Sequence, residues 1–422
     1  MMNGRPADPP LGLGTYEVVE ASPGPLTSWE AGNLVVDLES LRGSAAKEPA
    51  VEAVEVHLVR PGDPVRVANV LDAVVPHVKA DDPEATFPGV LGRLAPAGRG
   101  RSNRLGGVTV LSVCDLRAAG LVEQDELYET FVDMAGPGAE RSSFGSTTNV
   151  VLTFTPRPGA PAADVDLAVR RAGLRVARDL AATTIGSAPD REETFRPIGT
   201  GDDGEDLPRV AAILQVGSEG SFLDTFLYGL RMEGLVPTLL DPREVLDGAL
   251  TNGAYEWAGS RNATAFYQRS ALIHELFEAD GKSLRFAGLI VALGYLNTAF
   301  EKQRSAMLSA RLAQLLGADG VVCTTFETGN SHTDTMLTVR ACEHLGIRTT
   351  AIVTETNGGL TDHVPEADCI VSVGNEDELV PAWSPDRVIG ASAGRAGEPV
   401  PTWAYLGATC QTGDMRWRAV PE

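Results

Sequence analysis

The sequence has few cysteines and histidines, and their spacing excludes several kinds of site. No CxxC motif occurs, so the scattered cysteines are typical of reduced intracellular thiols rather than of a disulfide framework. No HxxxH pair occurs among the six histidines, so we expect no structural zinc site and assign no metal ligands. The cysteines are Cys114, Cys323, Cys342, Cys369 and Cys410.

Basic residues and long apolar runs are also scarce. The chain has 35 Lys and Arg against 57 Asp and Glu, a net charge of -22, which argues against nucleic acid and anionic membrane partners. No apolar stretch is long enough to cross a bilayer, and no early segment combines a basic start with an apolar core. We therefore expect a cytoplasmic protein. Its 422 residues suffice for two or three domains.

The first half of the sequence predicts a β-rich α+β domain over residues 11–186. Residues 1–10 are polar and rich in Pro and Gly, which predicts disorder. Alternating apolar and polar residues predict half-buried strands at 15–21, 33–38 and 51–59, and apolar runs predict strands at 108–113 and 150–154. Residues 164–182 repeat apolar side chains at helical spacing. The acidic, Pro- and Gly-rich stretch 187–207 is expected to be a linker.

The second half alternates predicted strands with predicted helices, which indicates an α/β domain over 208–422. The expected sheet is doubly wound and largely parallel, Rossmann-like or flavodoxin-like, with a long loop at 247–266. The predicted strands are 210–217, 235–240, 285–293, 318–325, 348–355 and 367–374. The predicted helices are 222–232, 270–277, 300–316 and 333–345.

Three loops of this domain follow strands, where parallel sheets bind ligands. They are 217–221, 324–335 and 354–362, and none contains a GxGxxG or GxxxxGK motif. The middle loop offers Glu327 and Asp334 as catalytic carboxylates, with Asn330 and Thr333 as polar neighbours. Thr333 or Asp334 is also a good helix N-cap. His332 can be a general base or a hydrogen-bonded surface histidine.

Other candidate residues lie in two glycine-rich turns of the first half. The turn at 98–104 can present Arg101 and Ser102 to an anion, or it can be a solvated loop. The GPG turn at 136–138 can direct Asp133 and Glu140 at one pocket, or it can be a rigid corner. Among the thiols, Cys410 in a glycine-flanked loop is a better reactive candidate than a cysteine in a buried strand.

Several segments resemble a known family along essentially the whole chain. They include VPTLLDPREVLDGAL at 236–250, FVDMAGPGAE at 131–140, and Gly329-Asn330 with Thr333-Asp334. Together they resemble the proprotein subunit of component B of glycine, sarcosine and betaine reductases, a relative of the D-proline reductase proprotein. The Arg101-Ser102 pair also fits a turn of that family.

The resemblance fails where the family has the cysteine at which its chain cleaves itself to form a pyruvoyl group. That position is Tyr255 here, and a second family cysteine is replaced by Gly259. Self-cleavage needs a Ser, Thr or Cys side chain. Ser260 and Thr264 lie at other offsets, so the resemblance implies an uncleaved chain without this cofactor. Two family acids of the middle loop are also replaced, by Thr325 and Phe326.

The resemblance implies a diverged, pyruvoyl-free subunit of a heteromeric reductase-like complex, which we expect to act in specialised metabolism. Such a subunit binds a small substrate for reductive or thiol-dependent C–N or C–X chemistry, together with a partner subunit bearing selenocysteine or cysteine. The alternative is a non-catalytic scaffold or ligand-binding subunit. The candidate catalytic residues are Glu327, Asp334, His332 and Cys410. The candidate substrate-binding residues are Arg101, Ser102, Asp133, Glu140, Tyr255, Asn330 and Thr333.

Overall fold

Two four-stranded sheets form the larger part of the N-terminal half of the computed structural model, which describes residues 8–122, 129–199, 206–253, 255–357, 367–391 and 394–413. Their strand orders are β13-β1-β9-β8 and β5-β12-β10-β7. The strands are β1 (Leu11–Glu17), β2 (Glu20–Pro23), β3 (Ser28–Glu30), β4 (Asn33–Val36), β5 (Val51–Val59), β6 (Val65–Ala68), β7 (Val70–Val74), β8 (His77–Lys79), β9 (Gly100–Gly106), β10 (Val108–Val113), β11 (Phe131–Asp133), β12 (Thr148–Pro156) and β13 (Arg191–Phe195). The helices are α1 (Leu38–Ala45), η1 (Pro83–Ala85), η2 (Ala139–Arg141), η3 (Ser143–Ser146) and α2 (Ala162–Ala182).

Helix α2 confirms the helical periodicity of its segment. Its buried face includes Val165, Val169 and Leu180, which belong to one apolar cluster with residues of β7 and β10. The predicted strand 108–113 coincides with β10, and 150–154 lies inside β12. The stretch expected to be a linker contributes β13, which pairs in antiparallel register with β1.

A six-stranded sheet organises the second half, in the order β17-β19-β14-β20-β21-β22. Every neighbouring pair is parallel except β17 with β19, so the sheet is largely parallel, as predicted. The strands are β14 (Arg209–Val216), β15 (Phe226–Leu227), β16 (Leu230–Arg231), β17 (Thr238–Leu240), β18 (Leu250–Thr251), β19 (Arg285–Leu293), β20 (Gly320–Thr324), β21 (Arg348–Glu355) and β22 (Cys369–Asn375). The helices are α3 (Pro242–Leu246), α4 (Thr264–Gln268), α5 (Ala271–Ala279), α6 (Ala299–Leu315) and α7 (Asn330–Glu343).

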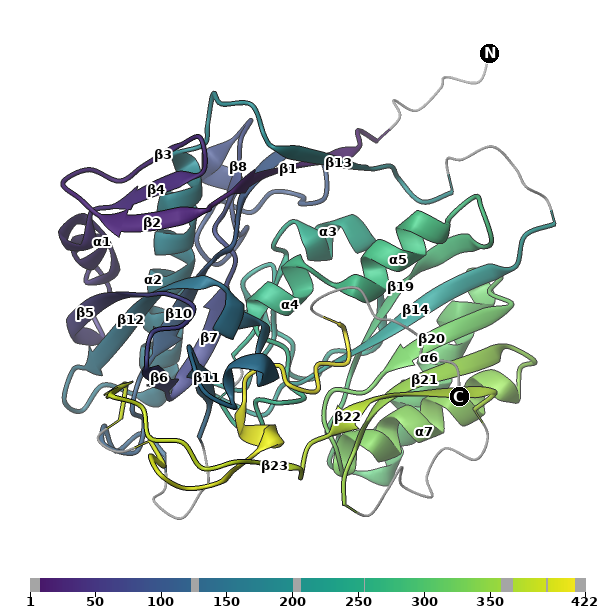
Figure 1. The fold of residues 1–422 in the computed structure, drawn as a ribbon. Helices are drawn as coiled ribbons and strands as arrows, with labels where there is room; N and C mark the ends of the chain where they lie inside the picture. Colours follow the sequence, from purple (N-terminus) through teal and green to yellow (C-terminus); the bar gives the residue numbers. More distant parts are fainter. Residues whose placement is uncertain are drawn as a thin grey trace.

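The central strands β14, β19, β20 and β21 are largely buried on both faces, which explains their nearly continuous apolar sequences, whereas the edge strands β17 and β22 are more exposed. In β14, Ala212 and Leu214 pack in one cluster with residues of α5, whereas Ala211 and Ile213 pack in another with residues of α6 and α7 (Figure 1). The structure is therefore a mixed α/β protein. The narrower Rossmann-like or flavodoxin-like classification stays a prediction.

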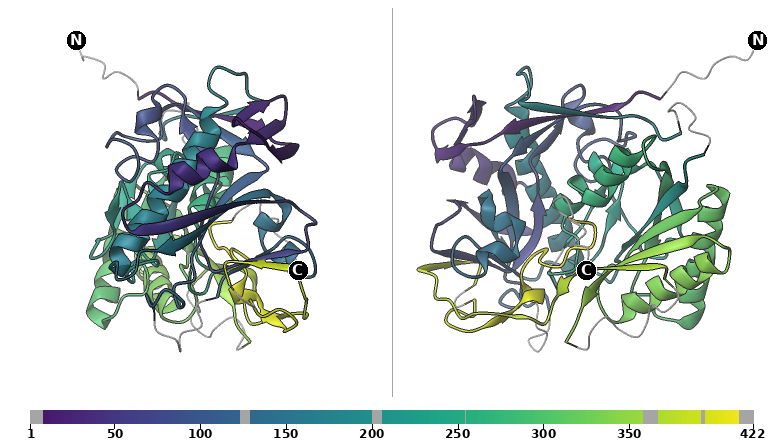
Figure 2. Two further views of the ribbon diagram at one scale, coloured as in Figure 1. Left: turned by 90° about the vertical axis from the view of Figure 1, so that its left-hand side faces the viewer. Right: turned by 45° about the vertical axis from the view of Figure 1, so that its right-hand side comes forward.

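The last part of the chain returns to the N-terminal half. Strand β24 (Arg387–Ile389) pairs in parallel with β6, and β23 (Leu379–Val380) pairs with β25 (Val400–Pro401), which is followed by η4 (Thr402–Ala404). Figure 2 shows this yellow segment along the border between the two halves. Strands from both sides of the predicted linker 187–207 therefore pair in one sheet. The domain limits stay a prediction.

Two predicted elements are wrong. Residues 222–232 do not form a helix, because Phe222, Tyr228 and Gly229 have φ of 70°, 50° and 80°, and the segment instead contains the hairpin β15–β16. Most of the turn predicted at 98–104 is strand β9, whose residues 102–105 are buried. Among the described residues, no helix is long and apolar enough to span a membrane.

Candidate functional site

A buried guanidinium lies between two carboxylates at the carboxyl ends of the parallel strands. Arg261, in the loop between β18 and α4, donates from Nε and Nη2 to Oε2 of Glu327 at 3.1 and 2.6 Å. Its Nη2 also lies 3.0 Å from Oε1 of Glu219. The ring of Phe326 lies 4.9 Å from the guanidinium carbon. We call Glu219, Arg261 and Glu327 the Arg261 cluster.

Two of the three predicted loops supply the carboxylates of this cluster. Glu219 follows β14 and Glu327 follows β20, which are neighbouring strands. Gln215 fixes the loop after β20, because its Oε1 accepts from Phe326 N at 2.6 Å and its Nε2 donates to Ser331 O at 3.2 Å. Of the third loop, residues 358–362 lie outside the described residues.

Burial raises the pKa of two carboxyl groups in and near this cluster, which makes them weaker acids than exposed carboxyl groups. Burial raises the pKa of Glu219, and the nearby Glu327 and Glu256 carboxylates raise it further, while Arg261 opposes them. Burial also raises the pKa of Glu376 to about 7, although the Thr328 hydroxyl donates to it at 2.6 Å. Carboxyl groups of this kind can exchange protons near neutral pH, as general acids and bases do.

Arg261 keeps one nitrogen available. Its Nη1 is buried and has no hydrogen-bond partner among the described residues. The side chain is 1% exposed, so an unpaired N–H group here is costly unless a ligand or water completes it. The arrangement can thus accept an anionic group at Arg261 beside a carboxyl group that can carry a proton.

The predicted residues of the middle loop divide into buried and exposed positions. Asp334 is buried in α7, where it pairs with Lys302 Nζ at 2.8 Å and accepts from Leu296 N at 3.1 Å, and burial raises its pKa. Asn330 donates to Leu296 O at 3.2 Å. His332 is buried, so its interpretation as a surface histidine is wrong, and Thr333 is exposed.

The N-cap predicted for α7 is also wrong. The helix starts at Asn330, three residues before the predicted start, and its N-cap is Gly329 with φ of 70°. Thr333 and Asp334 consequently lie inside the helix. This frees the Asp334 carboxylate for the loop between β19 and α6.

Cys410 lies beside the loop that carries Arg261. Its Sγ is 3.3 Å from Oδ1 of Asn262 and 3.1 Å from Oγ1 of Thr412. The backbone N–H of Thr409 donates to Gly259 O, so the C-terminal segment is fixed against the same loop. Only 7% of Cys410 is exposed, which places this thiol under the surface near the Arg261 cluster.

Arg101 and Ser102 lie outside this cluster. Ser102 Oγ donates to Asp247 Oδ1 at 2.5 Å, and Lys79 Nζ and Gly98 N donate to Oδ2 of the same carboxylate at 2.8 and 2.7 Å. Arg101 N donates to Asp81. Ser102 therefore has a structural role in joining β9 to the residues after α3.

Asp133 and Glu140 do not face one pocket. Asp133 is buried and pairs with Arg66, with Nε to Oδ1 at 2.6 Å, and its Oδ2 accepts from Tyr405 Oη at 3.1 Å. Glu140 is exposed in η2. The GPG turn is thus the rigid corner that the sequence left as an alternative.

Tyr255 is buried in the apolar cluster of the N-terminal half. It is 1% exposed, and Leu71, Cys114 and Phe222 belong to the same cluster. Burial raises the pKa of its phenol. The side chain therefore has the environment of a core residue.

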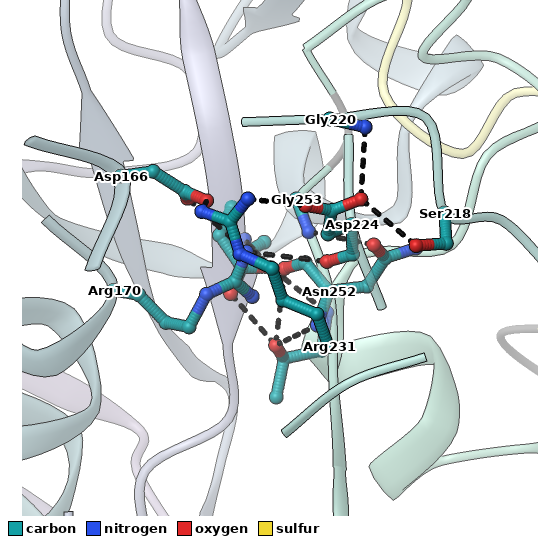
Figure 3. A network of polar contacts seen from close by, with 11 residues as sticks. Asp166, Arg170, Ser218, Gly220, Asp224, Arg231, Asn252 and Gly253 are labelled. Carbon is teal, nitrogen blue, oxygen red and sulfur yellow. Dashed lines mark hydrogen bonds and ion pairs between the residues drawn. The ribbon is translucent and has the colours of Figure 1, made fainter. Parts of the chain in front are cut away.

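A second polar network, which the sequence did not reveal, joins α2 to the segment around β15 and β16. Figure 3 shows Arg170 and Arg231 reaching toward Asp166 and Asp224. Arg170 Nη2 donates to Asp166 Oδ1 at 3.2 Å and to Asp224 O at 3.3 Å, and Arg231 lies 3.1 Å from Asp224 Oδ2. The adjoining cavity of about 10 Å³, bordered by Asn252, has room for about one water. The Asp166–Arg170 spacing on the buried face of α2 was the available signal.

Among the residues that the structure describes, no group of three or more His, Cys, Asp or Glu side chains could hold a metal ion.

Comparison with known proteins gives consistent matches. The model of a family described as "Glycine/sarcosine/betaine reductase component B subunits" matches residues 10–399. "Glycine reductase complex component B subunits alpha and beta" of Acetoanaerobium sticklandii is 30% identical over 389 residues, 90% of this chain and 88% of that protein. "Sarcosine reductase complex component B subunit alpha" of Peptoclostridium acidaminophilum is 30% identical over 90% of this chain and 89% of its own.

"Betaine reductase complex component B subunit alpha" of Peptoclostridium acidaminophilum is 31% identical over 386 residues, 88% of this chain and 85% of its own. No solved structure matches. All three relatives are described as components of reductase complexes.

Proposed function

Because the chain belongs to the family of glycine/sarcosine/betaine reductase component B subunits, we propose that it is a diverged, uncleaved and pyruvoyl-free subunit of a reductase-like complex. It binds a small substrate and acts with a partner subunit that carries a cysteine or selenocysteine. We place this complex in the cytoplasm and in specialised metabolism.

The residues present do not fit a pyruvoyl group. A phenol cannot attack the preceding carbonyl and then become a keto group, and Tyr255 is packed in the apolar core. The hydroxyl groups of Ser260 and Thr264 are engaged elsewhere. Thr264 Oγ1 donates to Asp72 Oδ2 at 2.7 Å, and Ser260 Oγ contacts Trp257 O at 3.5 Å.

The buried Arg261, whose Nη2 contacts two carboxyl groups and whose Nη1 is unused, is the observation that supports the substrate class most directly. Glycine, sarcosine and betaine each carry a carboxylate and an ammonium group on a short skeleton. We propose that a small zwitterion of this kind places its carboxylate at Arg261 Nη1. Its ammonium group then faces the Glu219 carboxylate, since opposite charges attract strongly in a site that excludes water.

The proposed reaction is the reductive cleavage of a C–N or C–X bond. For an amine, the C–N bond takes up two electrons and two protons, giving a C–H bond and a free amine. The electrons come from a thiol pair or a selenol and a thiol of the partner, which are oxidised to a disulfide or a selenenyl sulfide. Because burial raises its pKa, the Glu219 carboxylate can accept one proton from the ammonium group of an amine substrate and return it to the nitrogen as the C–N bond breaks.

Titration calorimetry with glycine, sarcosine and betaine tests the binding step. The wild type should bind at least one of them, and Glu219→Gln should weaken binding by about tenfold through loss of one charge-assisted contact. Arg141→Gln, which removes a surface pair with Glu378, is the matched control and should bind as the wild type does. Equal affinity in all three proteins would reject this site.

Turnover by the reconstituted complex separates catalysis from the scaffold alternative. Glu327→Gln and Asp334→Asn should each abolish turnover while complex formation stays unchanged. Should turnover survive both substitutions, the subunit is a scaffold or ligand-binding component. Cys410→Ser tests the thiol separately, because unchanged turnover in this variant removes Cys410 from the mechanism.

Intact mass spectrometry tests the uncleaved state. We expect one species near 44.5 kDa that does not react with a carbonyl-specific hydrazide. Two fragments divided near residue 255, the second with a carbonyl-reactive terminus, would show that the pyruvoyl chemistry is retained.

A further inference from the structure

A cleft of about 880 Å³ lies between the N-terminal sheet and the region around α5. Residues of β1, β9 and β13 line one side, and residues of α5 and the segment before β19 line the other. Figure 1 shows β1 and β13 running above α3 and α5. None of its lining residues belongs to the Arg261 cluster, so the cleft is a separate feature of the molecule.

The cleft is rich in guanidinium groups although the whole protein is strongly acidic. Five arginines and one histidine face four carboxylates there, whereas the chain as a whole has a net charge of -22. The basic residues are Arg104, Arg191, Arg196, Arg269, Arg285 and His274. The acidic residues are Glu17, Glu193, Glu278 and Asp280.

One carboxylate serves three of the basic groups. Glu193 Oε2 accepts from Arg104 Nη2 at 2.7 Å and lies 3.8 Å from Arg191 Nη2, and Glu193 Oε1 lies 3.6 Å from His274 Nδ1. Asp280, on the other side, already accepts the backbone N–H of Phe286. The wall formed by β9 and β13 therefore holds more positive than negative charge.

The arginines of this wall repel one another. Burial lowers the pKa of Arg104, and the guanidinium groups of Arg191 and Arg269 lower it further, while Glu193 opposes them. Arg104 is nonetheless held in place, because its Nε donates to Thr15 Oγ1 at 3.0 Å. Arg104 is also only 8% exposed. An anion between these guanidinium groups would relieve their repulsion.

We propose that this cleft binds a small molecule that carries a carboxylate or phosphate group. Guanidinium groups bind such oxyanions through two parallel N–H donors. Arg104 of β9, Arg191 of β13 and Arg269, the residue after α4, supply these donors. Val75, Phe195 and Phe277 add apolar surface to the lining, against which the skeleton of the ligand packs.

Titration calorimetry of the full chain with malonate and with inorganic phosphate tests the site. The wild type should bind at least one of the two probes. Arg191→Gln and Arg269→Gln should each weaken that binding by about tenfold, since each removes one charge-assisted contact. Arg157→Gln is the matched control, because the side chain of this exposed arginine donates to Pro49 O and does not line the cleft, so its loss should not change affinity.

A third substitution should change the affinity in the opposite direction. Glu193→Gln removes the carboxylate that competes with the ligand, so it should strengthen binding several-fold. Urea unfolding of each variant verifies that the fold is kept. The proposal is overturned if the wild type gives no heat of binding with either probe at millimolar concentration, or if the three cleft variants bind as the wild type does.

Discussion

Arg261 and Glu327 form a buried ion pair, with Nη2 of the arginine 2.6 Å from Oε2 of the glutamate, although 66 positions separate them in the chain. Glu219 approaches the same nitrogen to 3.0 Å. One guanidinium thus serves as the counterion for two carboxyl groups that the fold has removed from water. This relationship makes Arg261 essential to the stability of the strand ends as well as to the proposed substrate site.

Replacing Arg261 should destabilise the protein strongly. Arg261→Met leaves two buried carboxylates without a counterion, and loss of one partner of a buried pair typically costs about 3–5 kcal/mol. Urea unfolding measures the change. Arg348→Gln, which breaks the exposed pair with Asp368, should cost no more than about 1 kcal/mol. Equal costs in the two variants would contradict the burial of the Arg261 cluster.

Glu376 should make stability fall as pH rises toward neutrality. Burial raises the pKa of Glu376 to about 7 from its ordinary 4.5, so the folded state holds this proton more tightly than the unfolded state. The contribution is fully present below about pH 4.5 and is lost as pH rises through about 7, a change of about 3 kcal/mol. Free energies of unfolding measured at about pH 5 and about pH 8 should therefore differ more in the wild type than in Glu376→Gln.

Glu378→Gln is the control for the pH experiment. A hydrogen bond from Arg141 lowers the pKa of this carboxyl, so its removal should not flatten the fall in stability. If the stability of Glu376→Gln varies with pH as much as that of the wild type, Glu376 does not keep its proton in the folded protein near neutral pH.

Thiol labelling should distinguish Cys369 from the other cysteines. Cys369 is exposed, whereas Cys114, Cys323, Cys342 and Cys410 are buried. Burial also raises the pKa of Cys114 to about 12 and raises that of Cys323 well above its ordinary value, and a thiolate is the reactive form. Iodoacetamide should label Cys369 first in the native protein and all five after unfolding. Equally fast labelling of Cys410 would reveal an accessible reactive thiol there.

Tyr255 should behave as a core residue. Tyr255→Ala removes a ring that is 1% exposed and should cost about 3–5 kcal/mol in unfolding free energy, the usual cost of such a cavity. Tyr255→Phe keeps the ring and should cost about 1 kcal/mol. Thermal unfolding compares the two. A Tyr255→Ala protein as stable as the wild type would mean that the ring does not fill the core.

Local patterns in the sequence predict most of the regular elements. The run 108–113 contains only residues suited to a buried strand, and β10 has those bounds. Residues 164–182 fall within α2 for the same kind of reason, since every turn of the helix repeats an apolar residue. These signals depend only on neighbouring residues, so they can be recognised without knowledge of the fold.

The sequence did not predict unusual backbone conformations or contacts between residues that are far apart in the chain. The helix predicted at 222–232 is wrong, because Tyr228 has φ of 50°. Tyrosine rarely adopts this conformation, and the residue type does not predict it. Glu327 was identified from its loop, but nothing near it in the sequence indicates Arg261 as its partner. Arg170 and Asp224 likewise come together only through folding.

The pairing of β24 with β6 constrains how the protein is made. Val67 and Ile389 are neighbours in register, yet a ribosome must translate more than three hundred codons between them. At ordinary elongation rates this takes roughly tens of seconds. During that time one side of β6 lacks its strand partner and is open to wrong pairing with other nascent chains. The sheet of the N-terminal half is therefore completed only after β24 has been translated, and chaperones can act on β6 during this period.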